Sequence, residues 1–136
     1  MEPSALVTTA AALIGLAAGG GLVMGFMWLI GFRRTPYWLA MSHGISAILG
    51  LALLSYAAAV DGLPPMAKLA LILFAVASAG GAAITLLIHR KRDLKLSAPL
   101  ILGDAFLGAV GFVLLMLSIY GQRYVDTLSP IVLNNS

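Results

Sequence analysis

Four long apolar segments separated by short polar turns dominate this sequence. They cover residues 5–32, 38–60, 67–89 and 98–120, and each reaches the roughly 20 residues that a helix needs to cross a bilayer. Pro64 and Pro65 interrupt the chain after the second segment, because proline cannot donate a backbone hydrogen bond. Lipid offers no partners to backbone polar groups, so apolar segments of this length cross it as helices. The sequence therefore predicts an all-α, polytopic membrane protein with four transmembrane helices.

The composition is that of a membrane protein. Hydrophobic residues make up 61% of the chain and charged residues 10%, whereas a soluble domain has about 25% charged residues. The absence of cysteine from the sequence excludes a disulfide, a thiolate metal site, an iron–sulfur cluster and a covalently attached haem. The net charge of +3 comes from small clusters in the turns, so it indicates orientation in the membrane and does not favour nucleic acid as a partner.

The first apolar segment is expected to stay in the protein as a helix. It is longer than the 7–15-residue apolar core of a signal peptide, it follows the acidic Glu2, and no small-residue cleavage site comes after it. We therefore expect residues 1–121 to form one four-helix membrane domain. Residues 122–136 are expected to form a short C-terminal tail that is irregular or lies at the membrane interface.

The chain repeats itself at an interval of 61 residues. This shift places His43 on Asp104 and Gly50 on Gly111, and it places the first apolar segment on the third. Both two-helix units enter the membrane with the same polarity, which makes this a parallel repeat about an axis along the membrane normal. The predicted fold is a bundle of four transmembrane helices built from two parallel-repeat helical hairpins.

Basic residues favour one side of the membrane. Arg33 and Arg34 follow the first segment and four basic residues lie within residues 90–95, whereas the opposite side has only Lys68 and Arg123 near helix ends. The positive-inside rule then places both basic turns in the cytoplasm and both termini outside. The predicted location is the inner, cytoplasmic membrane of a bacterium.

Two ionisable side chains, His43 and Asp104, fall inside apolar segments at equivalent points of the repeat. Each lies roughly 10 Å from the cytoplasmic end of its helix, at ~1.5 Å per residue. A carboxylate at such a depth costs on the order of 2.5 kcal/mol and needs a partner, a proton or water. His43 meets Asp104 if the second and fourth helices are neighbours. The pair either fixes the packing of the repeats or forms a site for a proton or a polar ligand.

Small residues share the helix faces of these two side chains. Ala47 and Gly50 follow His43 by four and seven residues, and Gly108 and Gly111 follow Asp104 at the same spacing. Residues at this spacing lie on one face of a helix, and small residues let membrane helices approach closely. We therefore predict these four residues as helix-packing positions.

Haem b is a cofactor that the sequence suggests. A haem in a helix bundle needs axial ligands from facing helices, usually His with His or Met. The chain has two histidines, so His43 and His89 are the candidate cofactor ligands, with Met24 or Met27 as substitutes for His89. His89 adjoins the interface, and its depth differs from that of His43 by several ångströms.

These motifs resemble a loosely defined group of small bacterial four-helix inner-membrane proteins. The resemblance covers about residues 38–117 and rests on His43-x3-Ala47-x2-Gly50-x2-Leu53-Leu54 and on His89 before a basic turn. The pattern of the group has a histidine where this chain has Asp104. If the histidines of that group hold a b-type haem, as the resemblance suggests, this chain has an aspartate in place of one of them.

Three functions stay open from the sequence. The chain has no Ser/His/Asp set, paired carboxylates or divalent-metal cluster, so we do not expect an enzyme acting alone. The short turns leave little mass outside the lipid, which favours an accessory or anchoring subunit of a larger, energy-transducing membrane complex. Its partners are then the lipid bilayer and other membrane subunits or a second copy. The alternatives are a b-type haem electron-transfer protein using His43 and a proton-coupled carrier using His43 and Asp104.

Overall fold

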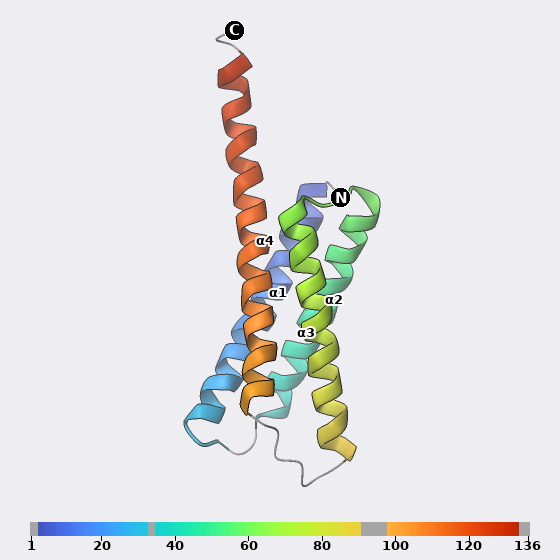
Figure 1. The fold of residues 1–136 in the computed structure, drawn as a ribbon, viewed down its shortest axis with the longest axis vertical. Coiled ribbons are helices and arrows are strands. Elements are labelled where there is room, and N and C mark those ends of the chain that lie inside the picture. The colour runs from blue at the N-terminus through green and yellow to red at the C-terminus, as the bar shows by residue number, and fades with distance from the viewer. Residues whose placement is uncertain (1–2, 33–34, 91–97, 134–136) are drawn as a thin grey trace.

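The computed structural model describes residues 3–32, 35–90 and 98–133, with side chains described in residues 5–32, 35–83, 86 and 102–127. These residues form four α-helices and no strand: α1 (Pro3–Leu29), α2 (Tyr37–Val60), α3 (Pro65–Arg90) and α4 (Ala98–Leu133). All four are long and apolar enough to cross a membrane, over Ala5–Leu29, Tyr37–Val60, Pro65–Ala83 and Leu102–Thr127. The predicted all-α bundle of four membrane helices is therefore confirmed (Figure 1).

The helix ends follow the 61-residue repeat. α2 begins at Tyr37 and α4 begins at the equivalent Ala98, while α1 ends at Leu29 and α3 ends at the equivalent Arg90. α2 ends at Val60, whereas α4 passes through Gly121, the repeat equivalent of Val60, and ends at Leu133. The two hairpins therefore differ mainly in the length of their last helix.

A glycine ends α1 three residues earlier than the predicted segment. Gly31 has a φ of 89°, and its N–H donates to the carbonyl of Trp28 while the N–H of Phe32 donates to the carbonyl of Met27. This is a Schellman motif, in which a left-handed residue closes the last turn of a helix. Among the described glycines, Gly62 after α2 also has a positive φ, whereas Gly121 within α4 does not.

The prediction of an irregular tail is wrong for residues 122–133, because α4 continues through them, while their place at the membrane interface stays a prediction. Gly121 keeps a negative φ, so it does not form the left-handed cap that ends α1. All side chains from Tyr120 to Thr127 are exposed, and Figure 1 shows this part of α4 standing alone beyond the rest of the bundle. The last helix therefore carries an extension that the other three helices do not cover.

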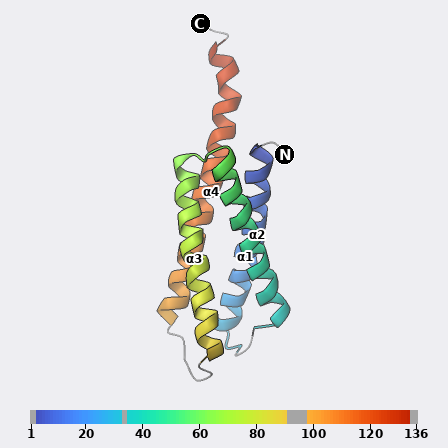
Figure 2. The ribbon, with the colours of Figure 1, turned by 90° about the vertical axis from the view of Figure 1, so that its right-hand side faces the viewer.

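The helices pack in cyclic order. α1 packs against α2 and α3 against α4, and the two hairpins meet where α1 contacts α4 and α2 contacts α3. Within the described residues the diagonal pairs α1–α3 and α2–α4 make no close backbone contact. This order is the one that a two-fold axis along the bundle produces, since it exchanges α1 with α3 and α2 with α4 (Figures 1 and 2).

The two ends of the bundle differ in their loops. α1 and α3 finish at one end, where α2 and α4 begin, and we call it the basic end because Arg33, Arg34 and residues 90–95 join the helices there. At the opposite end, the far end, α1 and α3 begin and the extension of α4 projects (Figure 1). The start of α1 therefore lies at the far end, and the last turns of α4 lie beyond it.

The core lies toward the far end. Four side chains, one from each helix, have no exposed surface, and together they form what we call the buried layer: Ala10, Leu54, Ala70 and Leu115. Leu54 and Leu115 are equivalent in the repeat and are the largest fully buried side chains of the described residues. All four belong to one hydrophobic cluster, which also contains Ile14 and Phe74.

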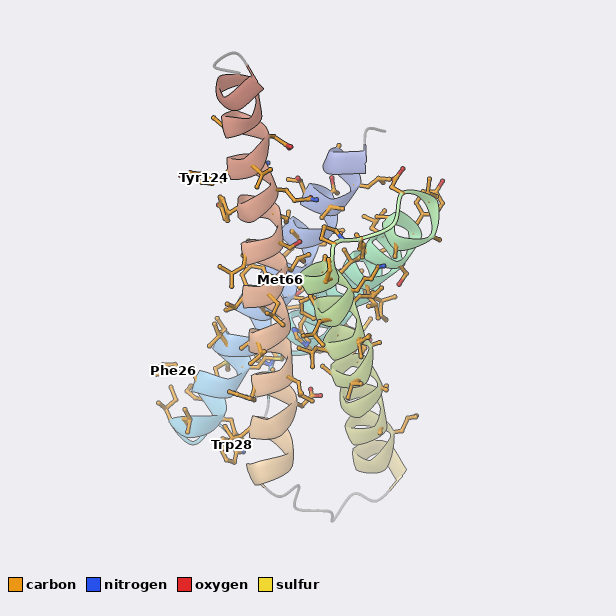
Figure 3. All side chains as sticks on the ribbon, turned by 45° about the horizontal axis from the view of Figure 1, so that its top comes forward. Phe26, Trp28, Met66 and Tyr124 are labelled. Carbon is orange, nitrogen blue, oxygen red and sulfur yellow. The ribbon has the colours of Figure 1, made fainter. Side chains whose placement is uncertain are left out.

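The outward faces of the helices are apolar. Phe26 is 62% exposed and Tyr124 is 68% exposed, and both side chains project away from the bundle in Figure 3. Trp28 and Trp38 are exposed near the basic end, where interfacial aromatic residues anchor membrane helices. A surface of this kind suits lipid, so the structure agrees with a multi-pass membrane protein.

Candidate functional site

His43 lies on α2, six residues after the first residue of that helix, and its ring packs against α1. Its Nδ1 is 2.7 Å from the carbonyl oxygen of Ala17. A carbonyl only accepts hydrogen bonds, so Nδ1 is the donor and the neutral imidazole carries its proton there. Nε2 is then left with a lone pair that can accept a proton or a hydrogen bond.

Two glycines of α1 make room for this ring. A Cβ atom added at Gly21 would lie 3.2 Å from Cε1 of His43, and one added at Gly20 would lie 3.3 Å from Cβ of His43. Both distances are shorter than ordinary van der Waals contact, so a side chain at either position would require the ring or α1 to shift by a few tenths of an ångström. The edge of the ring with Nδ1 and Cε1 therefore faces α1, and Nε2 lies away from it.

Asp104 lies on α4, also six residues after the first residue of its helix, and its carboxylate packs against α3. A Cβ atom added at Gly80 would lie 2.8 Å from Oδ1, and one added at Gly81 would lie 3.6 Å from Oδ2. The glycine pair of α3 thus provides the space that the carboxylate fills. Asp104 is half-buried, like His43.

The two polar side chains occupy equivalent places in the two hairpins. Each projects from the second helix of its hairpin onto adjacent glycines of the first helix, and Gly20 is equivalent to Gly81 in the repeat. Each lies about 9 Å from the start of its helix, at ~1.5 Å per residue. The repeat therefore places a histidine and an aspartate at one depth on opposite sides of the two-fold axis.

The structure places His43 and Asp104 on diagonal helices, close enough for their charges to influence each other but without a direct hydrogen bond or ion pair between the two described side chains. Their helices are diagonal in the bundle, so the interaction crosses its middle and does not require α2 and α4 to be neighbours. No other ionisable side chain of the described residues lies near the pair: α1 has none, Tyr37 and Tyr56 lie near the two ends of α2, Lys68 lies in the first turn of α3, and those of α4 lie at or beyond Tyr120. Among the described side chains of the spanning helices, the pair is therefore isolated from other ionisable groups.

The predicted packing positions behave differently from one another. Gly50 is buried against α1, where an added Cβ would lie 2.7 Å from Cγ1 of Ile14, and Gly111 is buried against the ring of Phe74 at 3.0 Å. Ala47 is half-buried. Gly108 is half-buried too, but an added Cβ would meet nothing within 4 Å. Close helix contact thus occurs at the two glycines nearer the far end.

The haem interpretation rests on residues that the structure places only in part. His89 is the second-last residue of α3, and its side chain lies outside the described ones, so its pairing with His43 stays a prediction. The hydrogen bond to Ala17 does orient His43 as a metal-ligating histidine is usually oriented. On the diagonal helix, however, the position equivalent to His43 holds the carboxylate of Asp104, which is not among the usual axial ligands of haem iron.

Met24 and Met27, the other candidate ligands, are half-buried on α1. Within the described residues the structure contains no group of three or more His, Cys, Asp or Glu side chains suited to a metal ion. A polar pair, rather than a ligand set, is what the described side chains form.

Sequence reasoning missed the carbonyl of Ala17 and the contact of the glycines with the pair. The repeated glycines at 19–21 and 80–81 were the available signal. Gly19 has no neighbour within 4 Å of an added Cβ, although its repeat equivalent Gly80 touches Asp104. The longer imidazole reaches one residue further along the first helix than the carboxylate does.

Comparisons with protein-family models, with curated proteins and with solved structures found no match for this chain. The resemblance to small four-helix bacterial membrane proteins therefore stays a prediction, and the function is argued from the geometry alone.

Proposed function

We propose that the protein is a small proton-linked membrane subunit in which the His43–Asp104 pair binds and releases a proton inside the bilayer. The observation that carries this proposal is the placement of two ionisable side chains at one depth, on diagonal helices, each packed on a glycine pair of the neighbouring helix. With Nδ1 committed to Ala17, the free nitrogen of His43 is Nε2. One proton can then reside on Nε2, leaving an imidazolium beside a carboxylate, or on Asp104, leaving both groups neutral.

The energetics favour a role beyond packing. A charged aspartate inside a membrane helix is costly, up to about 2.5–3.5 kcal/mol at the helix centre on insertion scales, while an interhelical hydrogen bond in a membrane protein contributes about 0.6 kcal/mol on average. A polar pair placed only to join the hairpins would therefore be poorly suited to its task. Intramembrane ionisable residues are commonly parts of proton pathways or ligand sites.

The proposed orientation has the basic end in the cytoplasm of a bacterium and both termini outside. Its support is that the loops carrying Arg33, Arg34 and residues 90–95 join helices at one end of the bundle. Basic loops of this length stay in the cytoplasm during insertion. The pair then lies nearer the cytoplasmic side, and the extension of α4 stands outside.

The direct test is infrared difference spectroscopy of the protein in lipid, recorded between acidic and alkaline buffer. The C=O stretch of a protonated carboxyl should appear at low pH, shift on carbon-13 labelling of aspartate, and vanish in Asp104→Asn. His43→Gln should move its pH midpoint, because it removes the group that interacts with Asp104.

Asp61→Asn provides the matched control, since Asp61 is exposed in the loop between α2 and α3. It should leave the Asp104 signal unchanged. A carboxyl signal that survives Asp104→Asn, or an Asp104 signal indifferent to His43→Gln, would contradict the proposal.

A second candidate function, that of an accessory or anchoring subunit, is favoured by the extension of α4. An isolated helix of this length is marginal in water, and the exposed side chains of residues 121–127 have no cover from the other helices. We expect the wild-type protein to co-purify with other membrane subunits in mild detergent. A chain truncated after Tyr120 should lose them while keeping the helical content of the bundle. Retention of the same partners by the truncated chain would argue against this role for the extension.

A further inference from the structure

The two sides of the His43–Asp104 pair are packed differently. Toward the far end, the buried layer of Ala10, Leu54, Ala70 and Leu115 closes the bundle with side chains that have no exposed surface. Leu54 and Leu115 lie eleven residues beyond His43 and Asp104 on the same helices, which is about three turns and about 16 Å. Eleven residues return nearly to the same helix face, so each leucine lies in line with one member of the pair.

Toward the basic end, the described side chains form no such layer. On α1 no described residue after Ala17 is buried, on α3 none after Phe74, and on α4 none before Gly111; on α2, Leu39 is buried near the helix start. Beside the pair the helices present Gly20, Gly21, Gly80 and Gly81, and the side chains of His43 and Asp104 fill the space against them. Among the described side chains, the fully buried apolar ones therefore lie on the far-end side of the pair.

We propose that the His43–Asp104 pair exchanges its proton with the basic end only, and that the buried layer seals it from the far end. This inference rests on the proposed function and adds the side of the membrane with which the pair exchanges its proton. A proton cannot cross a layer of alanine and leucine side chains without a chain of polar groups or water, and the layer supplies none. The buried hydroxyl groups of Ser46 and Ser118 lie on either side of the layer and not within it. In the resting protein the pair thus senses one compartment, and through-transport requires the layer to open.

The experiment uses the full chain in liposomes, with one substitution that reports its orientation. Carbon-13 labelling of aspartate lets infrared spectroscopy follow the Asp104 carboxyl. The chain has no cysteine, so Thr127→Cys, an exposed position beyond the far end, reports orientation through an impermeant maleimide. The outer pH is then lowered while the inner pH is held by a concentrated buffer. We expect the fraction of Asp104 that takes up a proton to equal the fraction of molecules with the basic end outward.

Two other results would have distinct meanings. Uptake by all molecules whatever their orientation would overturn the one-sided exchange and leave the proposed proton binding intact. No uptake even after an ionophore equalises the pH on both sides would overturn the proton binding itself, and the inference with it.

A variant of the layer tests the seal from the opposite direction. Leu54→Ala with Leu115→Ala should raise the proton leak of the liposomes severalfold, and adding Asp104→Asn should remove the increase. Leu49→Ala with Leu117→Ala is the matched control, since these leucines lie on the same two helices but are 50% and 54% exposed. An increase that persists with Asp104→Asn, or that the control pair reproduces, would overturn the assignment of the seal to the buried layer.

Discussion

Gly50→Ala should destabilise the bundle by about 1–3 kcal/mol, the usual cost of overpacking a core. The added Cβ would lie 2.7 Å from Cγ1 of Ile14, and 3.2 Å from both the carbonyl oxygen of Ala10 and the backbone nitrogen of Ile14. Two of these three atoms belong to the backbone of α1, so rotating a side chain does not relieve the contact. α1 and α2 have to move apart, which loosens the interface of the first hairpin. Unfolding by a denaturing detergent, followed by circular dichroism, measures the effect.

Gly44→Ala is the control for this substitution. It lies on the same helix, and an added Cβ would meet nothing within 4 Å. Alanine is favoured over glycine in a helix by about 0.8–1 kcal/mol, so this variant should be as stable as the wild type or slightly more stable. Equal stability of the two variants would show that α1 and α2 are not in the close contact described here.

Gly80→Ala should move the carboxylate of Asp104 with little change in stability. The added Cβ would lie 2.8 Å from Oδ1, which is the end of a side chain that can rotate away. The carboxylate would then leave its place beside α3, and its interaction with His43 would change. We expect the pH midpoint of the Asp104 infrared signal to shift, while the free energy of unfolding stays within about 1 kcal/mol of the wild type.

The repeat supplies the control in Gly19→Ala. Gly19 is the equivalent of Gly80 in the first hairpin, and an added Cβ there meets nothing within 4 Å. Its infrared signal should match that of the wild type. A shift of similar size in both variants would mean that the signal follows general loosening of the helices and does not report the contact of Gly80 with Asp104.

The four helices could be predicted from the sequence because length and hydropathy alone decide what crosses a bilayer. The starts of α2 and α4 were predicted within one residue for the same reason. The end of α1 required the backbone geometry of Gly31, which hydropathy does not reveal. The continuation of α4 was missed because Gly121 and the polar residues after it suggested an end that the backbone does not make.

The candidate site could be predicted only as two residues. Position in the repeat identified His43 and Asp104, since an ionisable group stands out in an apolar segment. Their surroundings depend on how each helix is rotated about its own axis. In a membrane protein both the lipid face and the packed face are apolar, so hydropathy carries little information on that rotation. The contact of His43 with Ala17 and the diagonal placement of α2 and α4 therefore needed the structure.

The extension of α4 also determines how many partners the far end can bind. A bundle with two equivalent hairpins would present the same surface twice, and a partner could bind in two orientations related by the two-fold axis. α2 ends at Val60, but α4 continues past the equivalent Gly121. The far end therefore presents one projecting helix and not a matched pair. A partner that grips this helix is held in one orientation and in a ratio of one per chain.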